Sequence, residues 1–186
     1  MGLFWGTLLI LIDLNVGAGG FRIDLVPDII GWILISDGVE NIFSRDSKRN
    51  EFLRVIHGME VMAVIQILIG IAGVSDYQNP EFIYRLYEGL RVAKALAWIF
   101  VLGIILKEFK LLELENEKFW NASGLKKTFS FFSITSICAS LLLPLCIYSN
   151  RLWGFCATAL LVGISAILFL IDLYQACKYW KEDHED

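Results

Sequence analysis

The chain of 186 residues is 56 % hydrophobic and 19 % charged, and its mean hydropathy is +0.60. A soluble domain of this length usually carries about 25 % charged residues and less than half apolar ones, so this composition indicates a protein whose main solvent is lipid. The same values exclude a disordered chain, and the net charge of −4 gives no electrostatic basis for nucleic-acid binding.

Six apolar stretches follow one another and predict an all-α, polytopic transmembrane helix bundle with four long helices and an N-terminal pair of short ones. They are Leu3–Leu14, Leu25–Ser36, Val55–Val74, Val92–Leu106, Phe129–Ile147 and Leu152–Leu173. The third, fifth and sixth approach the ~20 residues that a spanning helix needs. We expect one membrane domain over 1–186, comprising an N-terminal helical hairpin (1–40), a four-helix membrane bundle (41–178) and an acidic tail (179–186).

A glycine-rich polar turn separates the two short stretches of the N-terminal hairpin. Its glycines give the backbone freedom, and Pro27 suits the start of the second helix. The charged residues in or beside this turn are Asp13, Arg22, Asp24 and Asp28. Two alternatives follow. The hairpin either makes two thin, tilted spans, or re-enters the membrane with its irregular backbone buried in protein or lining a wet cavity.

The fourth apolar stretch belongs to a longer predicted helix. Asn79 is a good cap and Pro80 fits the first helical position, and no strong helix breaker follows until Gly124. The helix is therefore predicted from Pro80 to about Trp120, roughly 60 Å, which exceeds the ~30 Å hydrocarbon core, so one end should protrude. That end is either a solvated helix with ordinary charge pairs or a docking surface with Trp120 as an interfacial anchor.

Small residues recur on one face of this fourth helix. Gly89, Ala93 and Ala97 are spaced four residues apart, and such small-residue stripes allow close contact between helices. The contact is either within the chain or with a protein partner or second copy.

The basic residues predict the orientation in the membrane. If all six stretches cross, eleven Lys and Arg residues lie on the side of the two termini and four on the opposite side. Cytoplasmic loops carry the excess of Lys and Arg, so both termini are predicted in the cytoplasm of a multi-pass protein of the cell membrane.

Acidic and polar residues at membrane depth are the best candidates for a functional site. Such side chains are costly in lipid and usually face a cavity or a partner. The candidates for a small polar cavity are Asp13, Arg22, Asp24, Asp28, Gln66 and Asp172. This cavity would suit a cation, a proton or a small solute. In the alternative, Arg22 pairs with Asp24 or Asp28, and Asp28 stabilises the first turn of the following helix.

Histidine and cysteine give little basis for catalysis or metal binding. His57 and Glu60 share a helix face, but no second such pair accompanies them, and the four Cys residues lack zinc-site spacing. Cys146 and Cys156 flank a short turn, where they are either a disulfide or small apolar filler. We therefore predict no catalytic residues, no metal and no cofactor.

The N-terminal segment resembles a known signature. Phe4-Trp5-Gly6 and the later run Leu25-Val26-Pro27-Asp28-Ile29-Ile30-Gly31-Trp32-Ile33-Leu34-Ile35 are similar to the pattern of small uncharacterised polytopic membrane proteins of Firmicutes. The resemblance covers about the first forty residues. It implies a bacterial inner-membrane protein and brings no activity.

Two main functions are compatible with these features. The first is a non-enzymatic accessory or regulatory subunit in the lipid bilayer that acts through helix–helix contacts. The second is a small solute or ion transporter, or a substrate-capturing subunit, with its polar site in the N-terminal hairpin. An enzyme would rest on His57 and Glu60 alone.

Overall fold

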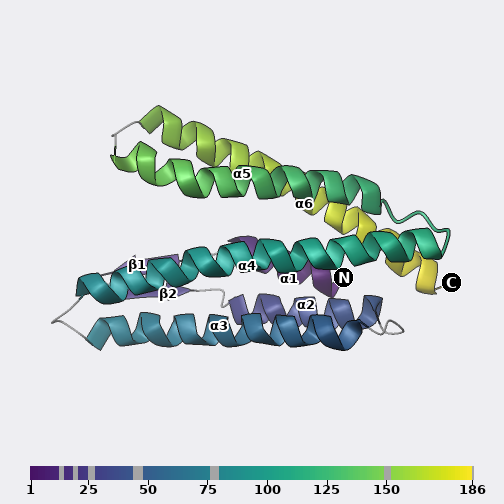
Figure 1. Ribbon diagram of the computed structural model, residues 1–186, viewed down its shortest axis with the longest axis horizontal. Coiled ribbons are helices and arrows are strands. Elements are labelled where there is room, and N and C mark those ends of the chain that lie inside the picture. The colour runs from purple at the N-terminus through teal and green to yellow at the C-terminus, as the bar shows by residue number, and fades with distance from the viewer. Residues whose placement is uncertain are drawn as a thin grey trace. The chain divides into compact units, whose positions relative to one another are not determined.

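The computed structural model describes residues 1–12, 15–18, 21–24, 28–43, 48–75, 80–148 and 152–185. Within these ranges the chain is mostly helical, which confirms the predicted fold class at that level (Figure 1). The helices are α1 (Gly2–Ile12), α2 (Asp28–Ile42), α3 (Arg49–Ser75), α4 (Pro80–Glu115), α5 (Ala122–Tyr148) and α6 (Leu152–Glu185). The chain forms two compact units, Met1–Val101 and Leu102–Asp186, whose boundary lies inside the continuous helix α4.

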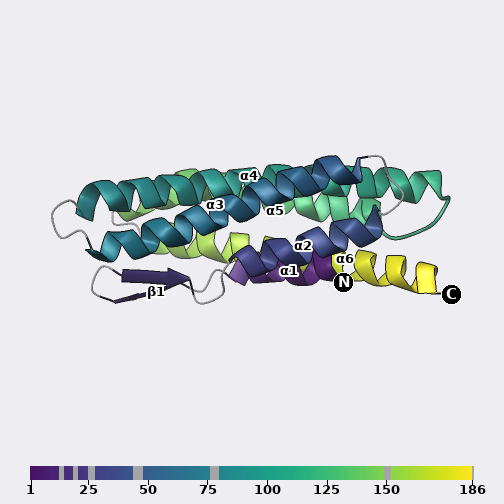
Figure 2. The ribbon, with the colours of Figure 1, turned by 90° about the horizontal axis from the view of Figure 1, so that it is seen from below.

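The polar turn of the N-terminal hairpin contains two short strands that the sequence analysis did not predict. Strands β1 (Asn15–Ala18) and β2 (Phe21–Asp24) pair antiparallel, with Asn15 opposite Asp24 and Ala18 opposite Phe21. Two glycines connect them, and Gly-Gly is a favourable sequence for a two-residue β-hairpin connection. The strands continue the line of α1 and α2, and β2 lies against α3 (Figure 2).

Glycines bring α1 and α2 into very close contact. A Cβ atom added at Gly6 would lie 2.3 Å from the carbonyl oxygen of Gly31. One added at Gly38 would lie 2.3 Å from the backbone nitrogen of Leu3. Because no larger residue fits at these points, the two short helices pack backbone against backbone, as small-residue helix pairs do.

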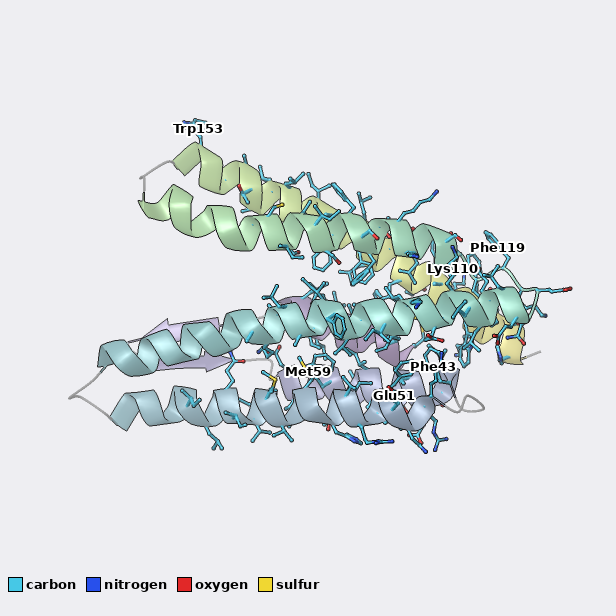
Figure 3. The ribbon with its side chains drawn as sticks, viewed as in Figure 1. Phe43, Glu51, Met59, Lys110, Phe119 and Trp153 are labelled. Atoms are coloured by element: carbon cyan, nitrogen blue, oxygen red, sulfur yellow. The ribbon has the colours of Figure 1, made fainter. Side chains whose placement is uncertain are left out.

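Helix α2, which is paired with α1, packs on α3 through apolar side chains. On α3, Phe52, Ile56, Met59 and Ala63 are buried at the three- or four-residue spacing of one helix face. Phe43, directly after α2, contacts Phe52 with ring centroids 5.2 Å apart. Figure 3 labels Phe43 and Met59, two members of this core.

Helix α4 begins at Pro80 as predicted but ends at Glu115, five residues before the predicted end. The chain turns at Glu117, whose φ of 53° is in the left-handed region. The Lys118 N–H donates to the Glu113 carbonyl at 3.2 Å, and the Glu117 N–H donates to the Leu114 carbonyl at 3.4 Å. These bonds form a Schellman motif, which usually carries glycine at the left-handed position. Glutamate stands there instead, so the usual stop signal is missing from the sequence.

In the second unit, α5 and α6 pack antiparallel around an aromatic core. Phe169 of α6 lies against Phe129 and Phe132 of α5, with ring centroids 5.4 and 5.5 Å apart. Thr135 and Ser165 are both buried and share a hydrogen bond of 2.7 Å across the two helices. Apolar packing and a polar contact therefore fix the same helix pair.

Candidate functional site

The first unit contains a buried ion pair between Asp28 and Lys94. Asp28 is the first residue of α2, and its Oδ2 accepts a hydrogen bond from the Nζ of Lys94 on α4. The two side chains are only 4 % and 12 % exposed. A buried charge without a partner is very unfavourable, whereas a paired one is tolerated. The carboxylate also benefits from its place in the first turn of a helix.

Gln66 lies at the height of this ion pair on the neighbouring helix. Phe43 and Phe52 are in contact and fix how α2 and α3 align. Asp28 precedes Phe43 by about 22 Å along α2, and Gln66 follows Phe52 by about 21 Å along antiparallel α3. The Gln66 side chain is buried, and its Oε1 has no hydrogen-bonding partner among the described residues. Two of the predicted cavity residues thus occupy one level of the first unit.

The described structure does not place the other predicted cavity residues beside Asp28, Lys94 and Gln66. Asp13 lies outside the described residues. Arg22 and Asp24 are in β2, opposite Gly17 and Asn15, and their side chains are also outside the description. Asp172 belongs to the second unit, where Thr128 Oγ1 donates to its Oδ2 at 2.9 Å.

Lys94 is the site residue that sequence reasoning left aside. Its position within the apolar run 92–106 was the available signal, because a lysine at such a position normally has a buried partner. The partner itself could not be read from the sequence, since Asp28 is 66 residues away.

Two polar pairs link α5 and α6 on their shared face. The Thr128–Asp172 and Thr135–Ser165 pairs are seven residues apart on each helix, which places both on the shared face. Interhelical hydrogen bonds of this kind set the register of helices in an apolar environment. Asp172 therefore has a local structural partner.

The predicted small-residue stripe of α4 is largely uncovered. Gly89 and Ala93 are exposed, and nothing lies within 4 Å of a Cβ atom added at Gly89. Ala97 is half-buried. The close helix contact of the first unit is instead made by glycines of α1 and α2, as described above. A contact of the α4 stripe with another chain stays a prediction.

The end of α4 and the start of α5 are joined by a buried carboxylate. Glu113 Oε1 accepts hydrogen bonds from the backbone N–H groups of Trp120 at 2.6 Å and Ala122 at 3.2 Å. Its side chain is 7 % exposed, so it satisfies backbone donors at the start of α5 inside the protein. The interpretation of this region as only a solvated helix end is wrong for Glu113.

Trp120 is also buried, and the idea that it forms an exposed interfacial anchor is wrong. Its ring stacks on Phe109 with a centroid distance of 5.5 Å and lies 5.8 Å from His184. The exposed aromatic residue of this turn is its neighbour Phe119, which is 78 % exposed (Figure 3). Because Glu113 binds the Trp120 backbone, the indole is turned inward and Phe119 outward.

An ion pair links the α4–α5 connection to the C-terminal end of α6. Lys118 Nζ donates to Asp183 Oδ1 at 2.6 Å, and this hydrogen bond lowers the pKa of Asp183 from its ordinary value. The pairing is therefore present at neutral pH and is lost as the pH falls through the lowered pKa. Lys118 is half exposed, so the pair contributes little to stability.

The histidine and cysteine residues do not form a metal centre in the described part of the chain. No group of three or more His, Cys, Asp or Glu side chains that could hold a metal is found there. His57 is exposed on α3. Cys156 is a free thiol, and the side chain of Cys146 lies outside the described residues.

No family model, curated protein or solved structure matches the chain. What the protein does is therefore inferred from its own buried polar groups and exposed apolar faces.

Proposed function

We propose that the chain is an integral protein of the bacterial inner membrane, with α3 to α6 crossing the bilayer and both termini in the cytoplasm. Among the described residues, Arg49–Ile69 of α3 and Cys156–His184 of α6 are long and apolar enough to cross. Only 28 % and 17 % of their apolar windows are buried. The core helix of a soluble protein would bury most of such a window, so lipid contact is the better account of both helices.

The exposed face of α6 supports a full crossing. Its exposed large apolar residues are Leu160, Leu161, Ile164, Ile167, Leu168 and Ile171. Trp153, labelled in Figure 3, is 88 % exposed and precedes this face. Tyr174, 43 % exposed, follows it. They are about 31 Å apart along the helix, close to the thickness of the hydrocarbon core. Tryptophan and tyrosine favour the two boundaries of that core.

Helix α3 also supports a membrane crossing, and it indicates how deep in the membrane the polar site would lie. Its exposed side chains include Val61, Ile65 and Leu68, whereas Gln66 is on the inner face. The apolar part of α3 begins at Val55, so Gln66 would lie about 16 Å inside a hydrocarbon core of ~30 Å. Asp28 and Lys94, at the same height, would form their ion pair near the middle of the membrane.

Within the membrane, we infer a non-enzymatic accessory or regulatory role that depends on helix–helix contacts. The observation that carries this proposal is the uncovered face of α4. Gly89 and Ala93 leave open space on it, and Leu96 and Phe100 are 47 % and 69 % exposed. A second helix could approach the α4 backbone closely at the two small residues and pack on the two large ones.

Photo-crosslinking in native membranes tests this role. A benzophenone side chain in place of Leu96 should give a discrete adduct, whose mass distinguishes a second copy from another protein. Ala93→Leu should abolish the adduct by filling the approach, whereas Ala95→Leu, at another exposed position of α4, should leave it. An adduct that survives Ala93→Leu, or no protein adduct at all, would contradict the proposal.

The buried Asp28–Lys94 pair favours transport as a second candidate function. Ionisable groups at membrane depth often mark ion or solute pathways. Proteoliposomes loaded with a pH-sensitive dye would test proton flux. The double variant Asp28→Asn with Lys94→Gln removes both charges of the ion pair. Proton flux through the native protein that is lost in the folded double variant would support transport. Proton flux that is equal for the native protein, the double variant and protein-free liposomes would exclude proton transport.

A further inference from the structure

Thr7 Oγ1 of α1, Trp32 Nε1 of α2 and Gln66 Oε1 of α3 are polar atoms of the first unit that are buried without a hydrogen-bonding partner among the described residues. Their side chains are 0 %, 1 % and 9 % exposed. Buried polar atoms in proteins are nearly always hydrogen-bonded to protein or to ordered water, so each of these exceptions requires an explanation.

Thr7 and Trp32 lie close to one level of the α1–α2 pair. The close contacts place Gly38 beside Leu3 and Gly31 beside Ile10, which defines how the antiparallel helices align. Thr7 is midway between Leu3 and Ile10, so it lies within about one turn of Trp32 along the helix axis.

Gln66 approaches the same level from α3. The Phe43–Phe52 contact places Ala63 at the level of Trp32 along the helix axes, because each is eleven residues from its phenylalanine. Gln66 is about 4.5 Å further along α3, between the levels of Trp32 and Asp28.

The chemistry of the three atoms is complementary to water. The Trp32 indole can only donate, the Gln66 carbonyl oxygen can only accept, and the Thr7 hydroxyl can do either. A buried water typically makes about three hydrogen bonds to polar groups that have no other partner. We propose that Thr7, Trp32 and Gln66 bind ordered water between α1, α2 and α3, one turn from the Asp28–Lys94 ion pair. This site does not depend on the proposed function.

Radiolytic footprinting of the detergent-purified full chain tests the water site. X-rays generate hydroxyl radicals from bound water, so a buried side chain is oxidised when water lies beside it. After correction for intrinsic reactivity, Trp32 should be oxidised about fivefold faster than Phe43, which is equally buried but has an aromatic neighbour. The variant Thr7→Val with Gln66→Leu should reduce Trp32 oxidation to the level of Phe43.

A matched control and a second measurement keep the test decisive. Thr158→Val with Gln175→Leu makes the same chemical changes in α6 and should leave Trp32 oxidation unchanged. The nearly isosteric Thr7→Val should lower the melting temperature if its hydroxyl binds water, and raise it if the hydroxyl is buried dry. Trp32 as protected as Phe43, or a higher melting temperature for Thr7→Val, would overturn the proposal.

Discussion

Lys94 changes how Asp28 is understood. From the sequence, Asp28 was either a helix-stabilising acid or part of a cavity, and the structure gives it a buried cationic partner. The position of Asp28 at the start of α2 still provides the favourable helix-dipole interaction. Its burial beside α4 is explained by the ion pair, since an isolated carboxylate would be too costly there.

A double-mutant cycle measures how much this ion pair contributes to the free energy of unfolding. Asp28→Asn leaves Lys94 buried without its counter-charge and should lower the free energy of unfolding by about 3–5 kcal/mol. Adding Lys94→Gln removes the remaining charge and should recover much of that loss. The measurement is denaturant unfolding in mixed micelles. Additive effects of the two substitutions would show that the charges do not interact.

Glu117 occupies a position that suits glycine. Its φ is 53°, where a side chain is strained, so Glu117→Gly should raise the free energy of unfolding by about 1 kcal/mol. Glu115→Gly removes the same charge from the last residue of α4 and should be destabilising by up to about 1 kcal/mol. Thermal unfolding of both variants separates relief of backbone strain from loss of charge. If only the lost charge mattered, both variants would change the stability in the same direction.

At the scale of elements, the N-terminal hairpin is built by glycine contacts. Neither α1 nor α2 reaches the length of a full span by itself, since they measure about 16 and 22 Å. They pack backbone against backbone at Gly6 and Gly38, and α2 packs on α3. The hairpin therefore depends on its neighbours for stability more than on its own helix propensity.

Alanine substitutions of two glycines test this dependence. Gly6→Ala puts a Cβ atom against the Gly31 carbonyl oxygen, which must move, so a loss of about 1–3 kcal/mol is expected. Gly58→Ala is the control, because nothing lies within 4 Å of its added Cβ and it should gain about 0.8–1 kcal/mol from helix propensity. Melting temperatures of the purified variants give the comparison. A neutral Gly6→Ala would contradict the close contact.

At the scale of the whole molecule, the main feature is the distribution of polar and apolar groups. Buried polar residues such as Asp28, Gln66 and Ser165 are on the inside, while large aliphatic side chains of α3 and α6 are exposed. So many exposed aliphatic side chains on two helices are more than a soluble surface usually carries, and they suit a lipid environment.

Cysteine labelling tests the proposed orientation. In a background without the native cysteines, Trp153→Cys and Phe119→Cys place thiols at positions whose native side chains are 88 % and 78 % exposed, on either side of α5. With both termini in the cytoplasm, a membrane-impermeant maleimide should label position 153 in spheroplasts and position 119 only after permeabilisation. Equal labelling of both in intact spheroplasts would contradict a crossing by α5.

Features that depend on local chemistry could be predicted from the sequence alone. Apolar content predicted a mostly helical fold, and the sequence Asn79-Pro80 predicted the start of α4 at Pro80. The unusual polar residues Asp28 and Gln66 were also recognisable, because a polar group within an apolar stretch is visible without any knowledge of its neighbours.

Which of these residues meet depends on how the helices pack and could not be predicted from the sequence. Lys94 pairs with Asp28 across 66 residues, and the inward position of Trp120 follows from the carboxylate of Glu113. The glycines of α1 and α2 are likewise required because of the backbone of the opposite helix, which leaves no room for a Cβ atom. These contacts depend on the register and facing of helices, which are set by packing between distant segments and not by the local pattern of any one of them.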